Sequence, residues 1–384
     1  MRHLFLTVHE CAFGEVLLAR RIAEELALGG DEVWYLAPRA LAPALRGAAV
    51  RFGTIDHARG LTDRVLSAIV ADSGADSVFL VDAMSTFSAL ASMGQDCGRL
   101  VALPAPVLAL DVWDLATSGL VIDFTDGWFE LDARVLGVPR LVPVPFARPT
   151  AAGAYRSLRA PTVDPAARAR GRARLGLAAG DAMVLFPTAT WQHVEAVKPQ
   201  TQPSARAVPA LLAAYVKAAG ARLVHVGPWR LPGIEVLGDA YHHLPQLPPA
   251  EFADLMAAAD LLLSLNASAT SIGGALAARV PVLLLHHESP PARVGAPSLA
   301  PFRAWPYGLS RLLAGVLANN PFAGVVASAE LLDEPAVLGA LESLLRDPRA
   351  IAEARQRTDG YLAEVATLPS GRERYLEALR TARP

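Results

Sequence analysis

A short polar loop, Asn266–Ser271, carries three hydroxyl groups where a helix is predicted to begin. It follows the apolar run Leu261–Leu265, which has the length and composition of a buried strand. A helix start offers free backbone N–H groups and the positive end of the helix dipole. The hydroxyls of Ser268, Thr270 and Ser271 add further donors. We therefore predict that this loop binds a phosphate group.

A second set of reactive side chains follows the first predicted strand, which ends near residue 8. His9, Glu10 and Glu15 lie in or just after the loop there, and Asp82 ends a later apolar run. A carboxylate beside an imidazole fixes its tautomer and stabilises the imidazolium, so His9 and Asp82 make physical sense as an acid–base pair. Glu10 and Glu15 are the competing bases. In the structural alternative, His9 bonds to backbone and Asp82 caps a helix near Ser85.

Apolar strand-like runs alternate with helical stretches through the segment 1–150. Continuous apolar strands between helices are typical of a parallel sheet covered on both faces. A stretch rich in Pro, Ala and Arg, 151–181, breaks the pattern and is expected to be a solvated linker with a helix. A second alternation fills 182–348, and helices are expected at 349–384. The pattern predicts an α/β fold with two doubly wound, Rossmann-like parallel-sheet domains.

In the first half, the individual strands are expected at Leu4–Val8, Glu32–Leu36, Ser77–Val81, Leu100–Leu103, Val107–Leu110, Leu120–Phe124 and Leu141–Val144. In the second half, the segment His242–Pro245 is expected to be a turn.

Composition narrows the class of protein further. The chain has 384 residues, 53% of them hydrophobic and 19% charged, with a net charge of −2. This balance is globular and gives no reason to expect a nucleic-acid partner. The apolar runs are too short to span a membrane, the N-terminus lacks a signal-peptide layout, and two cysteines make no disulfide framework. We expect a cytoplasmic protein, with a homodimer as an open option.

Three segments resemble the two-domain glycosyltransferases of the GT-B fold. MRHLFLTVHECAFGEVLLARRIAEELALGGDEVWYLAP is similar to the family's opening, and RARLGLAAGDAMVLFPT to its entry into the second domain. ADLLLSLNASATSIGGALAARVPVLLL is similar to the donor site. There, Asn266 stands at the family's His, and Gly274 stands at the Glu that commonly binds the ribose of the donor. The resemblance implies two domains that face a central cleft.

The resemblance also assigns roles to individual residues. It implies that His9 is the catalytic base and that Asp82 orients it. Donor contacts fall on the loop after the first strand of the second domain, on the phosphate loop and after a later strand. These donor contacts are Thr188, Thr190, Lys198, Asn266, Ser268, Thr270, Ser271 and Glu288. The nucleotide base is expected at His243 and Leu244, through their backbone groups.

Asp111, Trp113 and Asp114 follow another apolar run, in the segment LDVWDL. Two carboxylates are few for a hard cation, which takes several oxygen ligands. We therefore expect these residues to line the acceptor side of the cleft, with helix caps and turns as the structural alternative, and we expect no metal site.

Together these features predict a metal-independent, base-assisted glycosyltransferase. A nucleoside diphosphate sugar would be its co-substrate, no cofactor would be tightly bound, and the acceptor would be a small molecule or a peptide. Two alternatives remain open: another enzyme on this fold, such as a sugar-nucleotide epimerase or a non-sugar transferase, or a non-catalytic protein that supports a partner enzyme.

Overall fold

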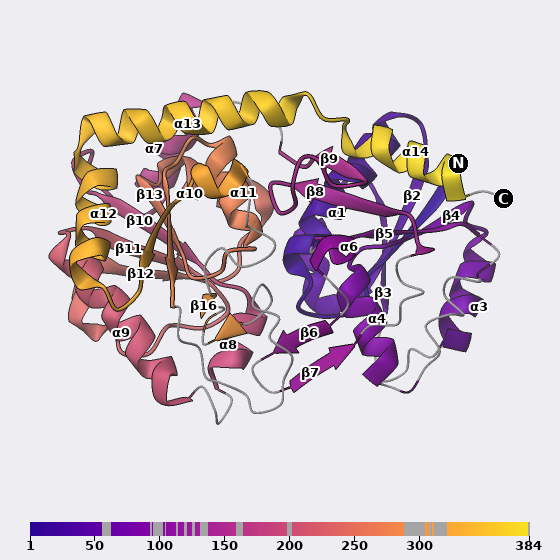
Figure 1. The fold of residues 1–384 in the computed structure, drawn as a ribbon, viewed down its shortest axis with the longest axis horizontal. Coiled ribbons are helices and arrows are strands. Elements are labelled where there is room, and N and C mark those ends of the chain that lie inside the picture. Colours follow the sequence, from indigo (N-terminus) through magenta and orange to yellow (C-terminus); the bar gives the residue numbers. More distant parts are fainter. Residues whose placement is uncertain are drawn as a thin grey trace. The chain divides into compact units, whose positions relative to one another are not determined.

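The computed structural model of this chain describes residues 1–382 apart from 56–62, 93, 95–102, 104, 113, 119–120, 125–126, 131–136, 159–163, 198–201, 288–303, 306, 308 and 311–320. The chain divides into two compact units, each with its own large sheet (Figure 1). Unit 1 combines Met1–Ile122, Phe129–Ser157 and Val365–Pro384. Unit 2 combines Asp123–Trp128 with Leu158–Glu364.

Unit 1 is built on a seven-stranded parallel sheet in the order β3-β2-β1-β4-β5-β8-β9. The chain first winds outward from β1 to β3 and then returns to place β4 on the other side of β1. This reversal makes the sheet doubly wound. Its strands are β1 Arg2–Leu6, β2 Glu32–Pro38, β3 Arg51–Ile55, β4 Ser77–Leu80, β5 Val107–Leu110, β8 Arg140–Val144 and β9 Ala154–Arg156.

Helix α1, Phe13–Leu28, shows how the sequence covers this sheet. Its residues Val16, Ala19, Ala23 and Leu26 recur at helical spacing and are fully buried. The helix ends at Gly29, whose N–H bonds back to the last turn. The other helices of unit 1 are α2 Ala42–Leu45, α3 Asp63–Ser73, α4 Ala83–Ser92, α6 Leu115–Ser118 and α14 Gly371–Ala382.

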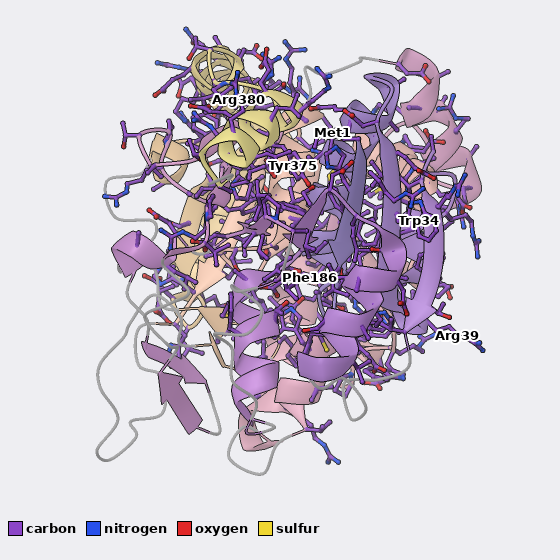
Figure 2. All side chains as sticks on the ribbon, turned by 90° about the vertical axis from the view of Figure 1, so that its right-hand side faces the viewer. Met1, Trp34, Arg39, Phe186, Tyr375 and Arg380 are labelled. Atoms are coloured by element: carbon purple, nitrogen blue, oxygen red, sulfur yellow. The ribbon has the colours of Figure 1, made fainter. Side chains whose placement is uncertain are left out.

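The C-terminal helix α14 belongs to the core of unit 1, where it packs on α1, β8 and β9. Tyr375, labelled in Figure 2, is fully buried, and its ring stacks on Phe5. Its hydroxyl lies 2.8 Å from Oγ of Ser77, which lies 2.7 Å from Nδ1 of His3. A buried polar chain thus ties α14 to the amino ends of β1 and β4.

Unit 2 repeats the doubly wound pattern. Its sheet runs in the order β12-β11-β10-β13-β14, and β17 pairs with β14; all these pairings are parallel. The short strands β15 Ala304–Trp305 and β16 Leu309–Ser310 pair antiparallel, and β16 adjoins β14. The long strands are β10 Met183–Pro187, β11 Arg222–Val226, β12 Tyr241–Leu244, β13 Leu261–Ser264, β14 Val282–His286 and β17 Ala327–Glu330. The helices are α7 Pro165–Arg174, α8 Thr190–Ala196, α9 Gln202–Ala218, α10 Pro249–Ala258, α11 Thr270–Ala277, α12 Glu334–Arg346 and α13 Pro348–Ala366.

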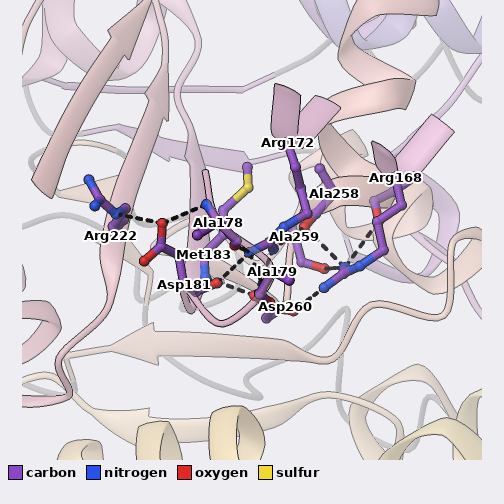
Figure 3. A network of polar contacts seen from close by, with 11 residues as sticks. Arg168, Arg172, Ala178, Ala179, Asp181, Met183, Arg222, Ala258, Ala259 and Asp260 are labelled. Carbon is purple, nitrogen blue, oxygen red and sulfur yellow. Dashed lines mark hydrogen bonds and ion pairs between the residues drawn. The ribbon is translucent and has the colours of Figure 1, made fainter. Parts of the chain in front are cut away.

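The arginine-rich helix α7 packs on α10 inside unit 2, whereas the sequence suggested a solvated linker. Arg172 is buried, and its guanidinium donates to the carbonyls of Ala178 (2.5 Å) and Asp181 (2.7 Å) (Figure 3). Arg168 pairs with Asp260 at 2.6 Å. The charge run therefore anchors the helix through backbone carbonyls and acidic partners, contacts that a charge pattern alone does not reveal.

The remaining differences from the sequence prediction concern short elements. The segment predicted as a strand at Leu120–Phe124 becomes β6, Val121–Phe124, which in the described part of the chain pairs with β7, Gly127–Glu130, in a separate two-stranded sheet. The predicted turn at His242 is part of strand β12, because parallel pairing with β11 extends through Leu244. Strand β3 was not predicted, since its exposed sequence RFGTI lacks an apolar run. The strand predicted at 100–103 lies mostly outside the described residues.

Candidate active site

In doubly wound sheets, ligands bind beyond the carboxyl ends of the strands where the winding reverses. In unit 1 this point lies between β1 and β4, whose register pairs Leu6 with Leu80. In unit 2 it lies between β10 and β13, where Leu185 pairs with Leu262. The loops after these four strands hold most of the predicted site residues.

Asp82 follows β4 and is almost completely buried. Its Oδ1 accepts the N–H of Ser85 at 3.1 Å, so it caps α4 as the structural alternative required. Burial raises the pKa of its carboxyl, and the hydroxyl and N–H of Ser85 together with the nearby His9 oppose that rise.

Glu15 lies in the first turn of α1 and is half-buried. Burial, reinforced by the charge of Asp82, raises the pKa of the Glu15 carboxyl to about 8. Ionising both of two neighbouring carboxyls in a poorly solvated place is unfavourable, because their negative charges repel. The pair therefore retains a proton near neutral pH. The structure therefore brings Asp82 together with Glu15, which the sequence offered only as a competing base.

His9 and Glu10 are exposed in the loop after β1. Nδ1 of His9 accepts the N–H of Cys11 at 3.1 Å, so it is not placed to donate to Asp82. Among the described residues, no hydrogen bond joins His9 to Asp82, although the two are close enough to interact electrostatically. The catalytic pairing of His9 with Asp82 stays a prediction.

Asp111 and Asp114 hold the local backbone of unit 1. Asp111 is buried; its Oδ2 accepts the N–H of Leu115 at 2.9 Å and lies 3.6 Å from Arg140. Asp114 has a left-handed backbone, with φ at 49°, and pairs with Arg148 at 3.6 Å. These contacts match the helix-cap and turn alternative. Trp113 lies outside the described residues, and the acceptor role of the three residues is untested.

The hydroxyl loop of unit 2 takes the predicted form. Oδ1 of Asn266 accepts both the N–H and the hydroxyl of Ser268, at 3.0 and 2.9 Å, which closes a tight turn. Helix α11 then begins at Thr270, and its N-cap, Ala269, has no side-chain oxygen to satisfy the first N–H groups. The helix start therefore offers backbone donors together with the hydroxyls of Thr270 and Ser271.

Thr188, the residue after β10, is held by two imidazoles. Its Oγ1 lies 2.8 Å from Nε2 of His193 on α8 and 2.8 Å from Nε2 of His225 on β11. Thr190 begins α8 and is half-buried. A polar residue in the apolar strand RLVHV is the one sequence signal that could have marked His225.

The predicted base-binding residues lie on β12. Nε2 of His243 lies 3.0 Å from the carbonyl of Gly227, and the carbonyl of Leu244 accepts the N–H of Gly227 at 3.0 Å. The two predicted donor contacts Lys198 and Glu288 lie outside the described residues.

A second imidazole–carboxylate pair, not predicted from sequence, lies at the same edge of the unit 2 sheet. Nδ1 of His287 is 2.6 Å from Oε1 of Glu330, at the ends of β14 and β17. Within the described ranges, no group of three or more His, Cys, Asp or Glu side chains is arranged to hold a metal ion. The described helices include none long and apolar enough to cross a bilayer.

Two doubly wound sheets of this order define the GT-B fold, and solved structures agree. The chain is similar to the spinosyn forosaminyltransferase SpnP, with a TM-score of 0.59, 15% identity, and coverage of 100% of this chain and 99% of that one. It is also similar to the glycosyltransferase SnogD from Streptomyces nogalater, with a TM-score of 0.55, 15% identity and full coverage of both chains. For the spinosyn rhamnosyltransferase SpnG with thymidine diphosphate, the TM-score is 0.57 at 15% identity, covering 98% of this chain and 100% of that one.

At this identity the likeness establishes the fold. The family itself is shown by a sequence model that matches residues 22–296 and 291–382: the chain belongs to a family of unknown function, DUF6365. Curated protein sequences provide no match.

Proposed function

We propose that this protein is a glycosyltransferase that moves a sugar from a nucleoside diphosphate donor to a small-molecule or peptide acceptor, without a metal ion. The observation that carries the proposal is the Glu15–Asp82 carboxyl pair at the winding reversal of unit 1. A buried carboxyl whose pKa is raised toward neutrality is suited to general-base work, because it is a stronger base than an ordinary carboxylate and still loses its proton near physiological pH.

In the proposed reaction, the ionised carboxyl of the pair takes the proton from a hydroxyl or amine of the acceptor. The acceptor oxygen or nitrogen forms a bond to the anomeric carbon of the sugar, while the bond from that carbon to the phosphate oxygen breaks. The nucleoside diphosphate leaves with the bonding electrons. His9, close to Asp82, remains the alternative base, and the variants described in the Discussion separate the two.

We assign the departing phosphates to the start of α11. The uncapped helix N-terminus and the hydroxyls of Thr270 and Ser271 supply donors to the negative charge that develops on the leaving group. Asn266 contributes by holding the turn that presents this helix start.

The solved structures of similar fold favour this class of substrates. They include the glycosyltransferase VinC in complex with DTDP, and the spinosyn rhamnosyltransferase SpnG complexed with thymidine diphosphate or with spinosyn aglycone. They support a nucleotide-linked donor and a small-molecule acceptor for this chain. A cytoplasmic location and a homodimer accompany the proposal as expectations.

A thermal-shift screen of nucleoside diphosphates and nucleotide sugars tests the proposal, because a ligand that binds only the native state raises Tm by mass action. We expect a nucleoside diphosphate to raise Tm, and inorganic phosphate at the same concentration to raise it less. If no nucleotide or nucleotide sugar changes Tm, the protein lacks a donor site and the non-catalytic alternative replaces this proposal. Binding without turnover of any nucleotide sugar, to water or an added acceptor, would favour the other transferase or epimerase alternatives.

A further inference from the structure

A chain of polar side chains crosses three neighbouring strands of unit 2, from Tyr241 at the start of β12 through His225 on β11 to Thr188 after β10. The hydroxyl of Tyr241 lies 3.0 Å from Nδ1 of His225. Oγ1 of Thr188 then links Nε2 of His225 to Nε2 of His193, with both distances 2.8 Å. His225 is fully buried, and Tyr241 and His193 are nearly so. Thr188 is half-buried. The buried protons of Tyr241 and His225 must therefore have acceptors within this chain.

Tyr241 sets which atom donates in each hydrogen bond of this series. Its hydroxyl oxygen accepts the N–H of Leu231 at 3.4 Å, and the guanidinium of Arg230 lies over its ring at 5.1 Å. If Nδ1 of His225 also donated to this oxygen, the buried hydroxyl proton would have no acceptor among the described residues. The satisfied arrangement has Tyr241 donating to Nδ1 of His225.

The remaining protons follow from this first step. With Nδ1 accepting, neutral His225 carries its proton on Nε2 and donates it to Oγ1 of Thr188. The single hydroxyl proton of Thr188 then donates to Nε2 of His193. His193 is left with its own proton on Nδ1. The four side chains thus select one tautomer of His193, in which Nδ1–H is a donor.

Burial keeps both imidazoles neutral, which this pattern requires. It lowers the pKa of His193 to about 4, helped by the nearby His243, and lowers the pKa of His225 further. Gly227 leaves room for the chain, because a Cβ at this position would collide with Oγ1 of Thr188 and Nε2 of His225. The arrangement is therefore fixed by packing as well as by hydrogen bonds.

His193 faces an exposed aromatic ring. The indole of Trp229, in the loop after β11, packs edge-to-face with His193 at 5.5 Å between ring centroids, and Trp229 is 53% exposed. Tyr307 flanks His193 in the same way, also at 5.5 Å. Nδ1 of His193 has no hydrogen-bond partner among the described residues, and it is not sealed from solvent. A planar ring lying on Trp229 would meet this donor at its edge.

We propose that His193 selects the base of the nucleotide donor: its Nδ1–H donates to the carbonyl at C4 of uracil or thymine, or at C6 of guanine. A base that presents an amino group there, cytosine or adenine, would set donor against donor. An unconstrained histidine would exchange tautomers to accommodate either base, whereas the chain from Tyr241 opposes that exchange. The inference rests on the proposed function, since it names the base of the donor that this function requires.

The first test reads the tautomers directly. Long-range ¹⁵N–¹H NMR spectra of the histidine rings should show His193 protonated on Nδ1 and His225 protonated on Nε2, without any ligand. Tyr241→Phe removes the hydroxyl that sets the sense of the chain, and both rings should then show mixed tautomers. A wild-type His193 protonated on Nε2 would overturn the inference.

The second test measures the affinity of UDP, CDP, GDP and ADP by calorimetry. Leaving buried donors unpaired costs about a tenfold to hundredfold loss of affinity, so wild type should bind UDP over CDP, and GDP over ADP, by at least tenfold. His193→Phe, which keeps a ring but removes the donor, should abolish this preference. Trp229→Ala should lower the affinity for all four nucleotides alike. Tyr241→Phe should reduce the preference for UDP and GDP, because it leaves the imidazole of His193 in place but free to change tautomer.

The outcomes separate the two proposals. Nucleotides that bind wild type with no keto preference, or a preference unchanged in His193→Phe, would overturn the role of His193 while leaving the proposed function intact. If none of the four nucleotides binds, the proposed function fails and the assigned ligand fails with it, whatever the tautomers.

Discussion

Gly227 and Thr188 lie against each other so closely that a methyl group on Gly227 would overlap Oγ1 of Thr188. The glycine is thus required by a side chain, and its backbone is not in the left-handed region. A Gly227→Ala chain must move either β11 or the Thr188 hydroxyl, which breaks the bonds to the two imidazoles.

We expect Gly227→Ala to lower the free energy of unfolding by about 1–3 kcal/mol, the usual cost of overpacking. Gly339→Ala is the matched control, because Gly339 is an exposed position of helix α12 and nothing lies within 4 Å of its added methyl. The control should be neutral or stabilising by about 0.5–1 kcal/mol. Denaturant unfolding of both variants checks this. Equal stability of the two would show that the Thr188 side chain can move away from the added methyl at little cost.

Glu15 makes the stability of unit 1 dependent on pH. Its pKa is raised from 4.5 to about 8 by burial and by Asp82, so the native state binds more protons than the unfolded state between these values. Stability therefore falls as pH rises from about 4.5 to about 8 and stays reduced above that. Glu15→Gln cannot ionise, and we expect it to be more stable than wild type by about 1–3 kcal/mol at pH 8.5.

The comparison at pH 5 serves as the internal control. There wild-type Glu15 is already protonated, so thermal unfolding should find Glu15→Gln and wild type within about 0.5 kcal/mol, as for an ordinary partly exposed substitution. A constant difference at both values of pH would mean that Glu15 is not a perturbed carboxyl.

The same carboxyl should shape the pH dependence of activity. If the Glu15–Asp82 pair is the base, kcat/KM rises with pH up to a plateau, with an apparent pKa near 8 that belongs to the pair. Glu15→Gln should remove this rising limb and lower turnover by about 10²–10⁴-fold. His9→Ala should retain the rise of kcat/KM with pH. If His9→Ala loses turnover and Glu15→Gln keeps it, His9 is the base instead.

The start of α11 gives a binding prediction. Replacing Thr270 and Ser271 together with Ala removes two hydroxyls, and hydrogen bonds to charged groups are worth about 1.5–3 kcal/mol each. We expect at least a tenfold weaker Kd for the bound nucleoside diphosphate in calorimetry. Ser343→Ala, on α12, controls for the loss of a helix hydroxyl. Unchanged affinity in the double variant would leave the loop as a structural turn only.

Arg172 and Arg174 lie on the same helix in opposite surroundings. The Arg172 side chain is 9% exposed and donates to the carbonyls of Ala178 and Asp181, whereas the Arg174 side chain is 41% exposed and pairs with Glu251. Arg172→Ala should cost about 1–3 kcal/mol of unfolding free energy, because it leaves these carbonyls without their donor. Arg174→Ala should cost about 0–1 kcal/mol. Similar losses for both would contradict the anchoring role of Arg172.

The fold was accessible from sequence because its signal is periodic. Short apolar runs such as SVFL and VLAL indicate buried strands, and runs of this kind alternate with helical stretches in both halves of the sequence. The hydroxyl loop was accessible for the same reason, since it lies between two such runs. Local pattern therefore predicted where the strand ends lie.

Contacts between distant segments were beyond that pattern. The pairing of Asp82 with His9 stays a prediction, whereas the interaction of Glu15 with Asp82 depends on how helix α1 packs. The tautomer of His193 depends on Tyr241, 48 positions away. Such contacts arise from three-dimensional packing. They cannot be predicted from residue type and spacing in a single sequence.

The place of α14 in the core of unit 1 makes that unit discontinuous in sequence. Tyr375 stacks on Phe5, so two distant segments of the chain complete one core, while Leu158–Glu364 is a continuous insertion between them. A chain cut just before α14 would keep unit 2 whole, whereas β5, β8 and β9 of unit 1 would lose the helix that packs on them. Proteolysis at this single point would therefore damage the unit that contains the N-terminal strand and spare the unit that is nearer in sequence.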